Sequence, residues 1–365
     1  MPRRAPLPNP TSPPDGPPVH EQPTKEPTDP TRSDTIEQVL RKFDRAQQRS
    51  NTIGFVVGVV KKYGDDSGGL LAAQLAFAGF LSFFPLILVI VTITAFLAQR
   101  SPALAERIRT SALSEFPVVG SDLTNDAGKL PGSGLGLMVG FLGLVWGGFG
   151  FTQALQFAFL EVWHVPHKTR PGFFFRMAHG LAVFALLGMA GAASLTLSLL
   201  GTLIKNSRVV GALGLIGACA ISAGLFFAMF WLLSPRNVRA IDLLPGAALA
   251  ALGWQALQMT GIRLVGYQLR RSSELYGTIG ATLGLIWFLQ LFTQVLIYAL
   301  EVTVVRKDRL WPRSMLQPPL TGPDRAVLTS MAMQEERRPE EEVTVRFIDP
   351  ETRTTDQEFE SDVGG

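Results

Sequence analysis

The sequence predicts an all-α, polytopic membrane helix bundle with six transmembrane helices and disordered termini. The mean hydropathy is positive, +0.24, although both ends of the chain are polar, so the apolar residues are concentrated in the middle. Six runs of at least 20 residues contain no Asp, Glu, Lys or Arg. A bilayer core of about 30 Å requires roughly 20 apolar residues for a helix to cross it. Because backbone groups in lipid must pair within their own segment, these runs are predicted to be helices.

The predicted spans are residues 70–98, 135–160, 181–204, 209–233, 243–262 and 279–300. Only four residues, 205–208, separate the third span from the fourth, which predicts an antiparallel hairpin. The fifth span is the least hydrophobic because Gln255 and Gln258 lie within it. Residues 70–304 therefore form the expected six-helix transmembrane domain.

The flanking segments have different compositions. Residues 1–34 contain eleven prolines and no apolar stretch typical of a signal peptide, and they predict a disordered, Pro-rich tail. Residues 35–69 form a basic, amphipathic juxtamembrane segment, which either touches anionic lipid headgroups or simply leads into the first span. Residues 312–365 are mostly acidic towards the end and predict a second disordered tail.

The orientation is predicted from Lys and Arg near the span ends. With both termini cytoplasmic, eleven such residues lie on the inner side and nine on the outer side. The excess of positive charge predicts a multi-pass cell-membrane protein with both termini in the cytoplasm.

Several function classes lose support from composition. The formal net charge of +3 is explained by juxtamembrane Lys and Arg, so no nucleic-acid partner is expected. A single cysteine, Cys219, forms neither an intrachain disulfide nor a thiolate metal site. The histidines at 164, 167 and 179 have no carboxylate pair beside them, and no catalytic triad or phosphate loop occurs. We therefore expect no metal, no cofactor and no enzymatic activity.

Pairs of glutamine share a helix face in three of the predicted spans, where polar side chains are costly. They predict a polar bundle interior that could form a cavity or substrate path, and Glu301 lies one helical repeat further along the sixth span. The alternative is that the amides bond neighbouring helices together. The candidate residues are Gln153, Gln156, Gln255, Gln258, Gln290, Gln294 and Glu301.

Four segments in series carry a family resemblance. The first span reads Gln74-Leu-Ala-Phe-Ala-Gly-Phe-Leu-Ser-Phe-Phe-Pro-Leu, and the fifth is preceded by Ser234-Pro-Arg-Asn-Val-Arg-Ala-Ile-Asp-Leu-Leu-Pro-Gly-Ala. The sixth span opens with Tyr276-Gly-Thr-Ile-Gly-Ala-Thr-Leu-Gly-Leu-Ile-Trp and closes with Tyr298-Ala-Leu-Glu-Val. Together they resemble the YihY/virulence factor BrkB family of inner-membrane proteins, from about residue 65 to 306.

The resemblance implies six spans with both termini cytoplasmic and a role in envelope integrity. The sequence departs from the family pattern at Ala78 and at residues 172–175. Asp242 is expected to cap the fifth helix and Pro245 to lie in its first turn. Some members have been labelled ribonuclease, but this sequence lacks the clustered His and Asp ligands of such an enzyme. The positions that match family motifs are Pro85, Asn237, Arg239, Asp242, Pro245, Gly246, Tyr276, Gly277 and Gly280.

Two functions remain open. The chain either moves a lipid or hydrophobic solute, like a transporter or flippase, or serves as a scaffold whose cytoplasmic tails recruit partners. Membrane lipids are the expected contacts in both cases, and the sequence leaves open a homo-oligomer and unknown protein partners.

Overall fold

A computed structural model describes residues 44, 47, 49–98, 134–201, 207–268, 274–315 and 320–347. Within these ranges the regular elements are helices, with no strand. In chain order they are α2 (Asn51–Asp65), α3 (Gly68–Ala98), α6 (Gly134–Val162), the 3₁₀ turn η1 (His167–Thr169), α7 (Phe173–Gly201), α8 (Ser207–Leu233), α9 (Ala240–Gln268), α10 (Glu274–Asp308) and α11 (Gly322–Gln334).

The six charge-free runs of the sequence coincide with α3 and α6 to α10. Four of these helices contain stretches long and apolar enough to cross a membrane: Phe173–Ser194, Ile216–Leu233, Ala240–Gly261 and Thr282–Asp308. A shorter apolar stretch, Gly68–Phe83, lies in α3. The structure therefore shows a membrane-type helical bundle with four spans established by length and composition.

Helix boundaries differ from the charge-free runs where a charged side chain has partners inside the protein. Helix α7 begins at Phe173 and not at 181, because Arg176 in its first turn contacts Gln153 of α6. Helix α10 continues to Asp308, past Glu301, which forms an ion pair with Lys62. In both helices a charged residue limited the predicted span, but the helix itself extends past that residue.

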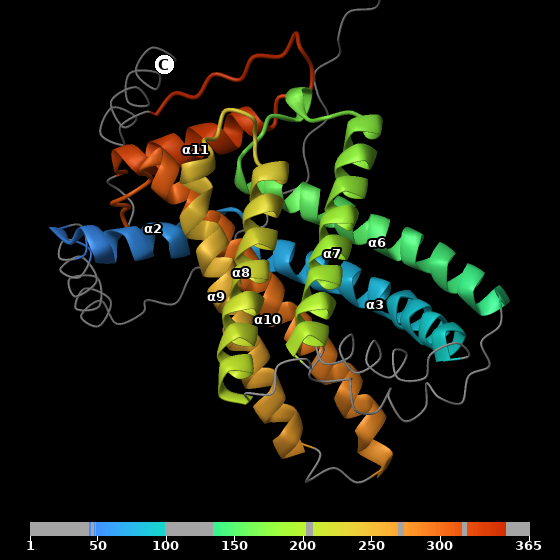
Figure 1. The fold of residues 1–365 in the computed structure, drawn as a ribbon. Helices are drawn as coiled ribbons and strands as arrows, with labels where there is room; N and C mark the ends of the chain where they lie inside the picture. Colours follow the sequence, from blue (N-terminus) through green and yellow to red (C-terminus); the bar gives the residue numbers. More distant parts are fainter. Residues whose placement is uncertain are drawn as a thin grey trace, which may run out of the picture.

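The six long helices form a closed circuit of neighbours. Helix α3 packs on α6 and α10, α10 packs on α9, α9 on α8, α8 on α7, and α7 returns to α6. Figure 1 shows α3 and α6 running side by side at an angle to the group formed by α7 to α10. Helix α2 joins this arrangement through contacts with α10 and α3.

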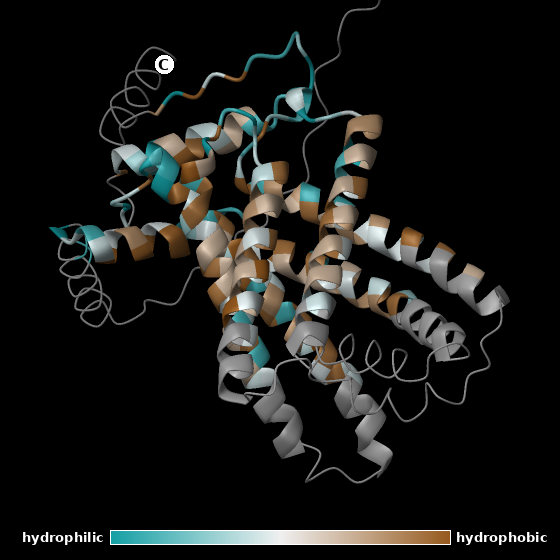
Figure 2. Cartoon of the chain, in the orientation of Figure 1, coloured by the Kyte–Doolittle hydropathy of each residue, from teal (hydrophilic) through white to brown (hydrophobic). Residues whose placement is uncertain are grey.

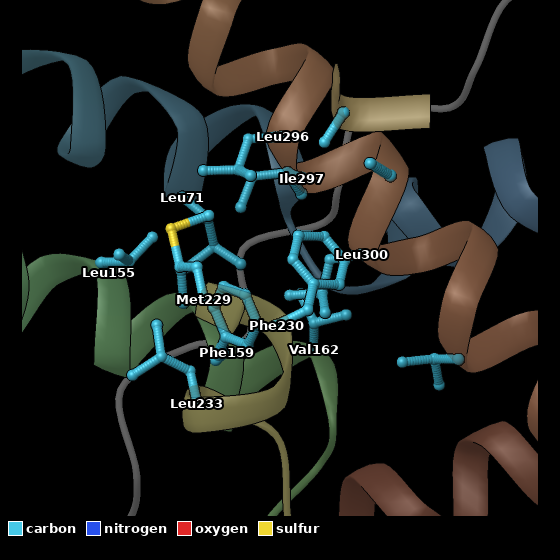
Figure 3. Close-up of a cluster of buried hydrophobic side chains, with 14 of the residues drawn as sticks. Leu71, Leu155, Phe159, Val162, Met229, Phe230, Leu233, Leu296, Ile297 and Leu300 are labelled. Carbon is cyan, nitrogen blue, oxygen red and sulfur yellow. The ribbon is translucent and has the colours of Figure 1, made fainter. Parts of the chain in front are cut away.

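The buried core is formed by residues of α3, α6, α8, α9 and α10. Figure 3 shows Leu155, Phe159 and Val162 of α6 facing Met229 and Phe230 of α8. The rings of Phe159 and Phe230 meet edge to face, with centroids 5.3 Å apart, an arrangement that aromatic pairs favour. Residues Leu71, Leu233, Leu296, Ile297 and Leu300 complete the labelled group.

Helix α11 corrects the prediction of a disordered tail from residue 312 onward. A capping box begins this helix: Asp324 N–H donates to Thr321 Oγ1, and Thr321 N–H donates to the Asp324 carboxylate. Val327 is fully buried against the core. Figure 2 shows that α11 mixes hydrophilic and hydrophobic residues. This composition suggested disorder, because the sequence pattern did not reveal the polar partners on the rest of the chain.

Candidate functional site: a buried ion network

Lys62, at the end of α2, is fully buried against the bundle. Gly58, one turn earlier, brings α2 close to the main chain, since a Cβ there would lie 3.0 Å from the carbonyl oxygen of Leu310. One residue later, the ring of Tyr63 stacks on that of Tyr298 with centroids 4.0 Å apart. These contacts fix the last turn of α2 on α10 and direct Lys62 towards Glu301.

All three hydrogens of the Lys62 ammonium have a nearby acceptor. Its Nζ lies 2.5 Å from Asp66 Oδ2, 2.9 Å from the carbonyl oxygen of Val162, and 3.0 Å from Glu301 Oε2. Burial alone would lower the pKa of Lys62, but the charges of Glu301 and Asp66 hold it above its usual value. Lys62 is therefore a buried positive charge among apolar helices.

Asp66 connects this lysine to His164. His164 Nε2 lies 2.9 Å from Asp66 Oδ1, while the other carboxylate oxygen faces Lys62. Burial raises the pKa of Asp66, but the hydrogen bond from His164 and the charge of Lys62 lower it further, so the net pKa lies below its usual value. We call Lys62, Asp66, His164 and Glu301 the buried ion network.

His164 occupies an unusual backbone position at the end of α6. Its φ is 46°, in the left-handed region that glycine favours. The His164 N–H donates to the Glu161 carbonyl at 2.9 Å, and the Val165 N–H donates to the Leu160 carbonyl at 3.0 Å. These two bonds form a Schellman-type helix end. A histidine here is more strained than glycine, and in exchange its ring reaches Asp66.

A second charged cluster fastens α11 beside this network. Asp324 is fully buried and accepts from Lys61 Nζ at 2.9 Å, from Arg313 Nε at 2.8 Å and from the Ser314 N–H at 3.0 Å. Although burial would raise it, these donors lower the pKa of Asp324 to about 2. Arg313 also pairs with Asp65 at 2.7 Å. We call Lys61, Arg313, Ser314 and Asp324 the tail anchor.

The loop between α6 and α7 holds the far end of α11. Gln334 donates to Glu161, whose other oxygen accepts from Arg170 at 3.0 Å. Lys168 pairs with Glu336 at 2.7 Å, and its main-chain N–H donates to the Glu336 carbonyl at 2.9 Å. The pKa of Glu336 is lowered by the hydrogen bond from Lys168. The segment after the membrane helices is thus bonded to α2 on one side and to the end of α6 and the following loop on the other, and Ser330 of α11 lies 2.6 Å from His164 Nδ1 of the buried ion network.

The hydrogen bonds of the predicted glutamines lie at two different helix pairs. Gln153 and Gln156 of α6 both contact Arg176 of α7, Gln156 Nε2 donating to its carbonyl at 3.1 Å. Gln255 of α9 donates to Ser222 of α8 at 3.1 Å. Gln258, Gln290 and Gln294 are half-buried. The bonds of Gln153, Gln156 and Gln255 therefore favour the alternative, in which amides link neighbouring helices.

Among the sequence candidates, Glu301 is the one that the structure places in the ion network, fully buried. Sequence reasoning missed Lys62 and Asp66, placed Lys62 in a surface segment, and considered His164 only as a metal ligand. A Lys and an Asp four residues apart, followed by a histidine at the end of the next long helix, is too common a pattern to single out. The relevant signal was the position of Glu301, within a helix that continues past it.

Two of the family-motif positions, Gly246 and Pro85, lie at close contacts between helices. A Cβ on Gly246 would lie 1.9 Å from Thr303 Oγ1 and 2.4 Å from the Ala299 carbonyl oxygen, so glycine permits the close approach of α9 and α10. Pro85 lies inside α3, where a Cβ on Gly143 would come within 3.0 Å of it. Asn237 and Arg239 lie in the connection between α8 and α9. Tyr276, Gly277 and Gly280 lie in the first turns of α10.

Helix α9 corrects the expected cap. It begins at Ala240, one turn before the apolar run, so Asp242 lies within the first turn and Pro245 inside the helix. The Asp242 N–H donates to the Arg239 carbonyl at 3.0 Å. The acidic side chain is still close to the positive end of the helix dipole, where a carboxylate is favourable.

Apolar helices of membrane-spanning length, joined at one end by a buried ion network, define this chain as an integral membrane protein. It belongs to the virulence factor BrkB family, whose model matches residues 59–319. The match contains all four members of the ion network and ends before α11. No curated protein and no solved structure matches the chain.

Proposed function

We propose that this protein moves a lipid or hydrophobic solute across the cell membrane. In this proposal α3 and α6 join the four established spans, and both termini lie on the cytoplasmic side. Large apolar side chains of α3 and α6 support their place in lipid, since Phe77 is 64% exposed and Trp146 85% exposed. Membrane lipids are the proposed contacts, and the protein performs no bond-making reaction on its cargo.

The buried Lys62–Glu301 pair is the observation that carries this proposal. Both side chains are at most 1% exposed, yet they lie between helices that are otherwise apolar. Removing two charges from water costs several kcal/mol per ion before their attraction repays it. Ionisable groups in such places commonly serve polar or charged cargo, or ion coupling. In this proposal the pair provides the charged centre that interacts with the lipid headgroup.

The position of α11 bears on the scaffold alternative. Its Asp324 and Gln334 are bonded to this protein's own residues, Lys61 and Glu161 among them. The buried polar groups of α11 are therefore engaged within the chain, which makes this helix less suited to recruiting a partner. The mover hypothesis is favoured over the scaffold on this ground.

We expect the reconstituted protein to accelerate the movement of a fluorescent phospholipid between the leaflets of liposomes. Glu301→Gln keeps the shape of the side chain and removes its charge, and it should reduce the rate about tenfold or more. The rate is measured by chemical quenching of the outer-leaflet label. Gln255→Leu is the matched control within a span, because Gln255 links α8 to α9 away from the ion network, and it should retain most of the activity.

The proposal fails if the intact protein moves no phospholipid faster than empty liposomes do, across neutral, anionic and zwitterionic headgroups. Equal activity of Glu301→Gln and the intact protein would separate the function from the ion network. Loss of activity in Gln255→Leu with retention in Glu301→Gln would restore the glutamines as the polar path.

A further inference from the structure

The positive and negative charges of the ion network do not cancel when His164 is neutral. Lys62 contributes one positive charge, and Asp66 and Glu301 contribute two negative charges, all on side chains at most 1% exposed. With a neutral His164, the buried sum is one negative charge. With a protonated His164, whose side chain is 7% exposed, the sum is zero. Buried charges are stable only when compensated, so the network requires one further proton.

The hydrogen bonds around His164 show where this proton can lie. His164 Nδ1 is 2.6 Å from Ser330 Oγ, and Nε2 is 2.9 Å from Asp66 Oδ1. The Ser330 hydroxyl donates to the Val327 carbonyl at 2.8 Å. A hydroxyl has a single hydrogen, so in this geometry Nδ1–H must donate to Ser330, while Nε2–H donates to the carboxylate. The observed arrangement satisfies the doubly protonated ring, and a neutral ring would require the Ser330 hydroxyl to turn.

Glu301 offers a second location for the same proton. Lys62 Nζ donates to Asp66 and to the Val162 carbonyl and forms an ion pair with Glu301, and Asp66 accepts on both oxygens. Within the described part of the chain, both Glu301 oxygens are fully buried without a hydrogen-bond partner, and only Oε2 has the ion-pair contact with Lys62 at 3.0 Å. A carboxylate oxygen in this position is one that a proton would stabilise.

The surrounding charges are balanced among themselves and do not supply the compensation. From α2, Lys61 pairs with Asp324 at 2.9 Å and Asp65 with Arg313 at 2.7 Å. Glu161 of α6 pairs with Arg170, and Lys307 of α10 with Asp308. The other titratable neighbours are the stacked Tyr63 and Tyr298. Among the described residues named here, none offsets the net charge of the ion network.

We propose that the buried ion network is a proton-exchange site, in which one proton passes between His164 at the side covered by α11 and Glu301 inside the bundle, and that its passage drives the proposed movement of lipid. Inward transfer breaks the His164 Nε2–H bond and gives that proton to Asp66. Lys62 gives one of its protons to Glu301 and regains one from Asp66. The result is a neutral imidazole and a neutral Glu301 carboxyl, with Lys62 and Asp66 unchanged.

The backbone of His164 provides a selective variant. Because its φ of 46° suits glycine better than histidine, His164→Gly should relieve strain at the end of α6 while it removes the ring. Loss of proton exchange in a variant that still folds would therefore be due to the imidazole. His179→Gly does not serve as control, since it interrupts α7. His179→Asn does, because that ring is half-buried and its bond goes to its own helix at Phe175.

The first test is infrared difference spectroscopy of the full-length protein in lipid between alkaline and mildly acidic pH. We expect a protonated-carboxyl band that disappears in Glu301→Gln. In His164→Gly the proton has only Glu301 left, so the Glu301 band should be larger than in the intact protein. A role of His164 confined to holding α11 would leave the Glu301 band unchanged. Absence of any band that depends on Glu301 would overturn the proposal.

The second test separates this inference from the proposed function on which it rests. A gradient of one pH unit across the liposomes is expected to change the rate of phospholipid movement by up to about tenfold, the ratio of proton concentrations. His164→Gly should lose this response and His179→Asn should keep it. If phospholipid moves but its rate does not respond to the pH gradient, and the Glu301 infrared band is absent, the proton-exchange proposal is wrong and the proposed lipid movement stands. If the Glu301 infrared band is present but no phospholipid moves, the proposed lipid movement is wrong and the proton-exchange site stands.

Discussion

Single side chains carry most of the unusual physical chemistry of this protein. Lys62 is held by three acceptors, and Asp66 by two donors, so each is satisfied as an ion. At the same scale, the lack of a Cβ at Gly246 permits the close packing of α9 on α10. Gly246 has no room for a Cβ beside Thr303 and the Ala299 carbonyl. Both features are invisible in composition, because a lysine or a glycine in a membrane protein usually has an ordinary role.

We expect Gly246→Ala to destabilise the protein by about 1–3 kcal/mol, the typical cost of forcing an extra methyl group into a packed interior. The added Cβ meets main-chain oxygen of Ala299 at 2.4 Å, which can move only if α10 moves. Thermal unfolding in detergent measures the change. Gly224→Ala is the matched control in α8, since nothing lies within 4 Å of a Cβ there, and it should be neutral or slightly stabilising. Equal melting temperatures for the two variants would contradict the close approach of α9 and α10.

At the scale of elements, α11 is held by polar bonds and by the burial of Val327. The tail anchor concentrates its bonds on Asp324, which accepts from Lys61, Arg313 and Ser314. Its helix is only 13 residues long and would be marginal in isolation. The docking of α11 should therefore depend on the charge of one carboxylate.

Acid should release α11. The pKa of Asp324 falls from its ordinary 3.8 to about 2 in the folded protein, so its stabilisation is complete above pH 4 and is lost as the pH falls towards 2. A lowering of this size corresponds to about 2 kcal/mol. Hydrogen–deuterium exchange in residues 322–334 should increase over this pH range, ahead of exchange in α8.

Asp324→Asn should produce the same release at neutral pH, because the amide no longer compensates Lys61 and Arg313. Faster exchange in α11, with unchanged exchange in α8, is the expected result. Glu335→Gln is the control, since its side chain is 65% exposed and its pairing with Arg337 is a surface contact. If exchange in α11 is the same in all three proteins, the tail anchor does not hold this helix.

At the scale of the molecule, the sequence predicted the helical membrane bundle correctly but not its polar centre. Charge-free runs mark apolar helices reliably, because charges in lipid are costly. The same rule misplaced the start of α7 and treated Lys62 as a surface residue, since it counts charges and cannot see their partners. Lys62 and Glu301 are 239 residues apart in the chain, and only the fold brings them to 3.0 Å.

The candidate site was predictable in one residue of four. Glu301 was singled out because it follows the glutamines on one face of the sixth span. His164 was considered only as a metal ligand, and its pairing with Asp66 depends on the left-handed end of α6. The hydrogen bonds of Gln153, Gln156 and Gln255 join neighbouring helices, as amides do in apolar surroundings. Their sequence pattern fits both interpretations equally, and the contacts favour this one.

A double-mutant cycle between Lys62 and Glu301 tests the buried ion pair most directly. Lys62→Met, Glu301→Gln and the double variant are compared by thermal unfolding of the full-length protein in lipid nanodiscs. Lys62→Met should cost about 3–5 kcal/mol, because it leaves buried carboxylates uncompensated. The double variant should be more stable than Lys62→Met, with a coupling energy of about 1–3 kcal/mol. Additive effects of the two substitutions would contradict a buried ion pair and remove the charged centre on which the proposed function depends.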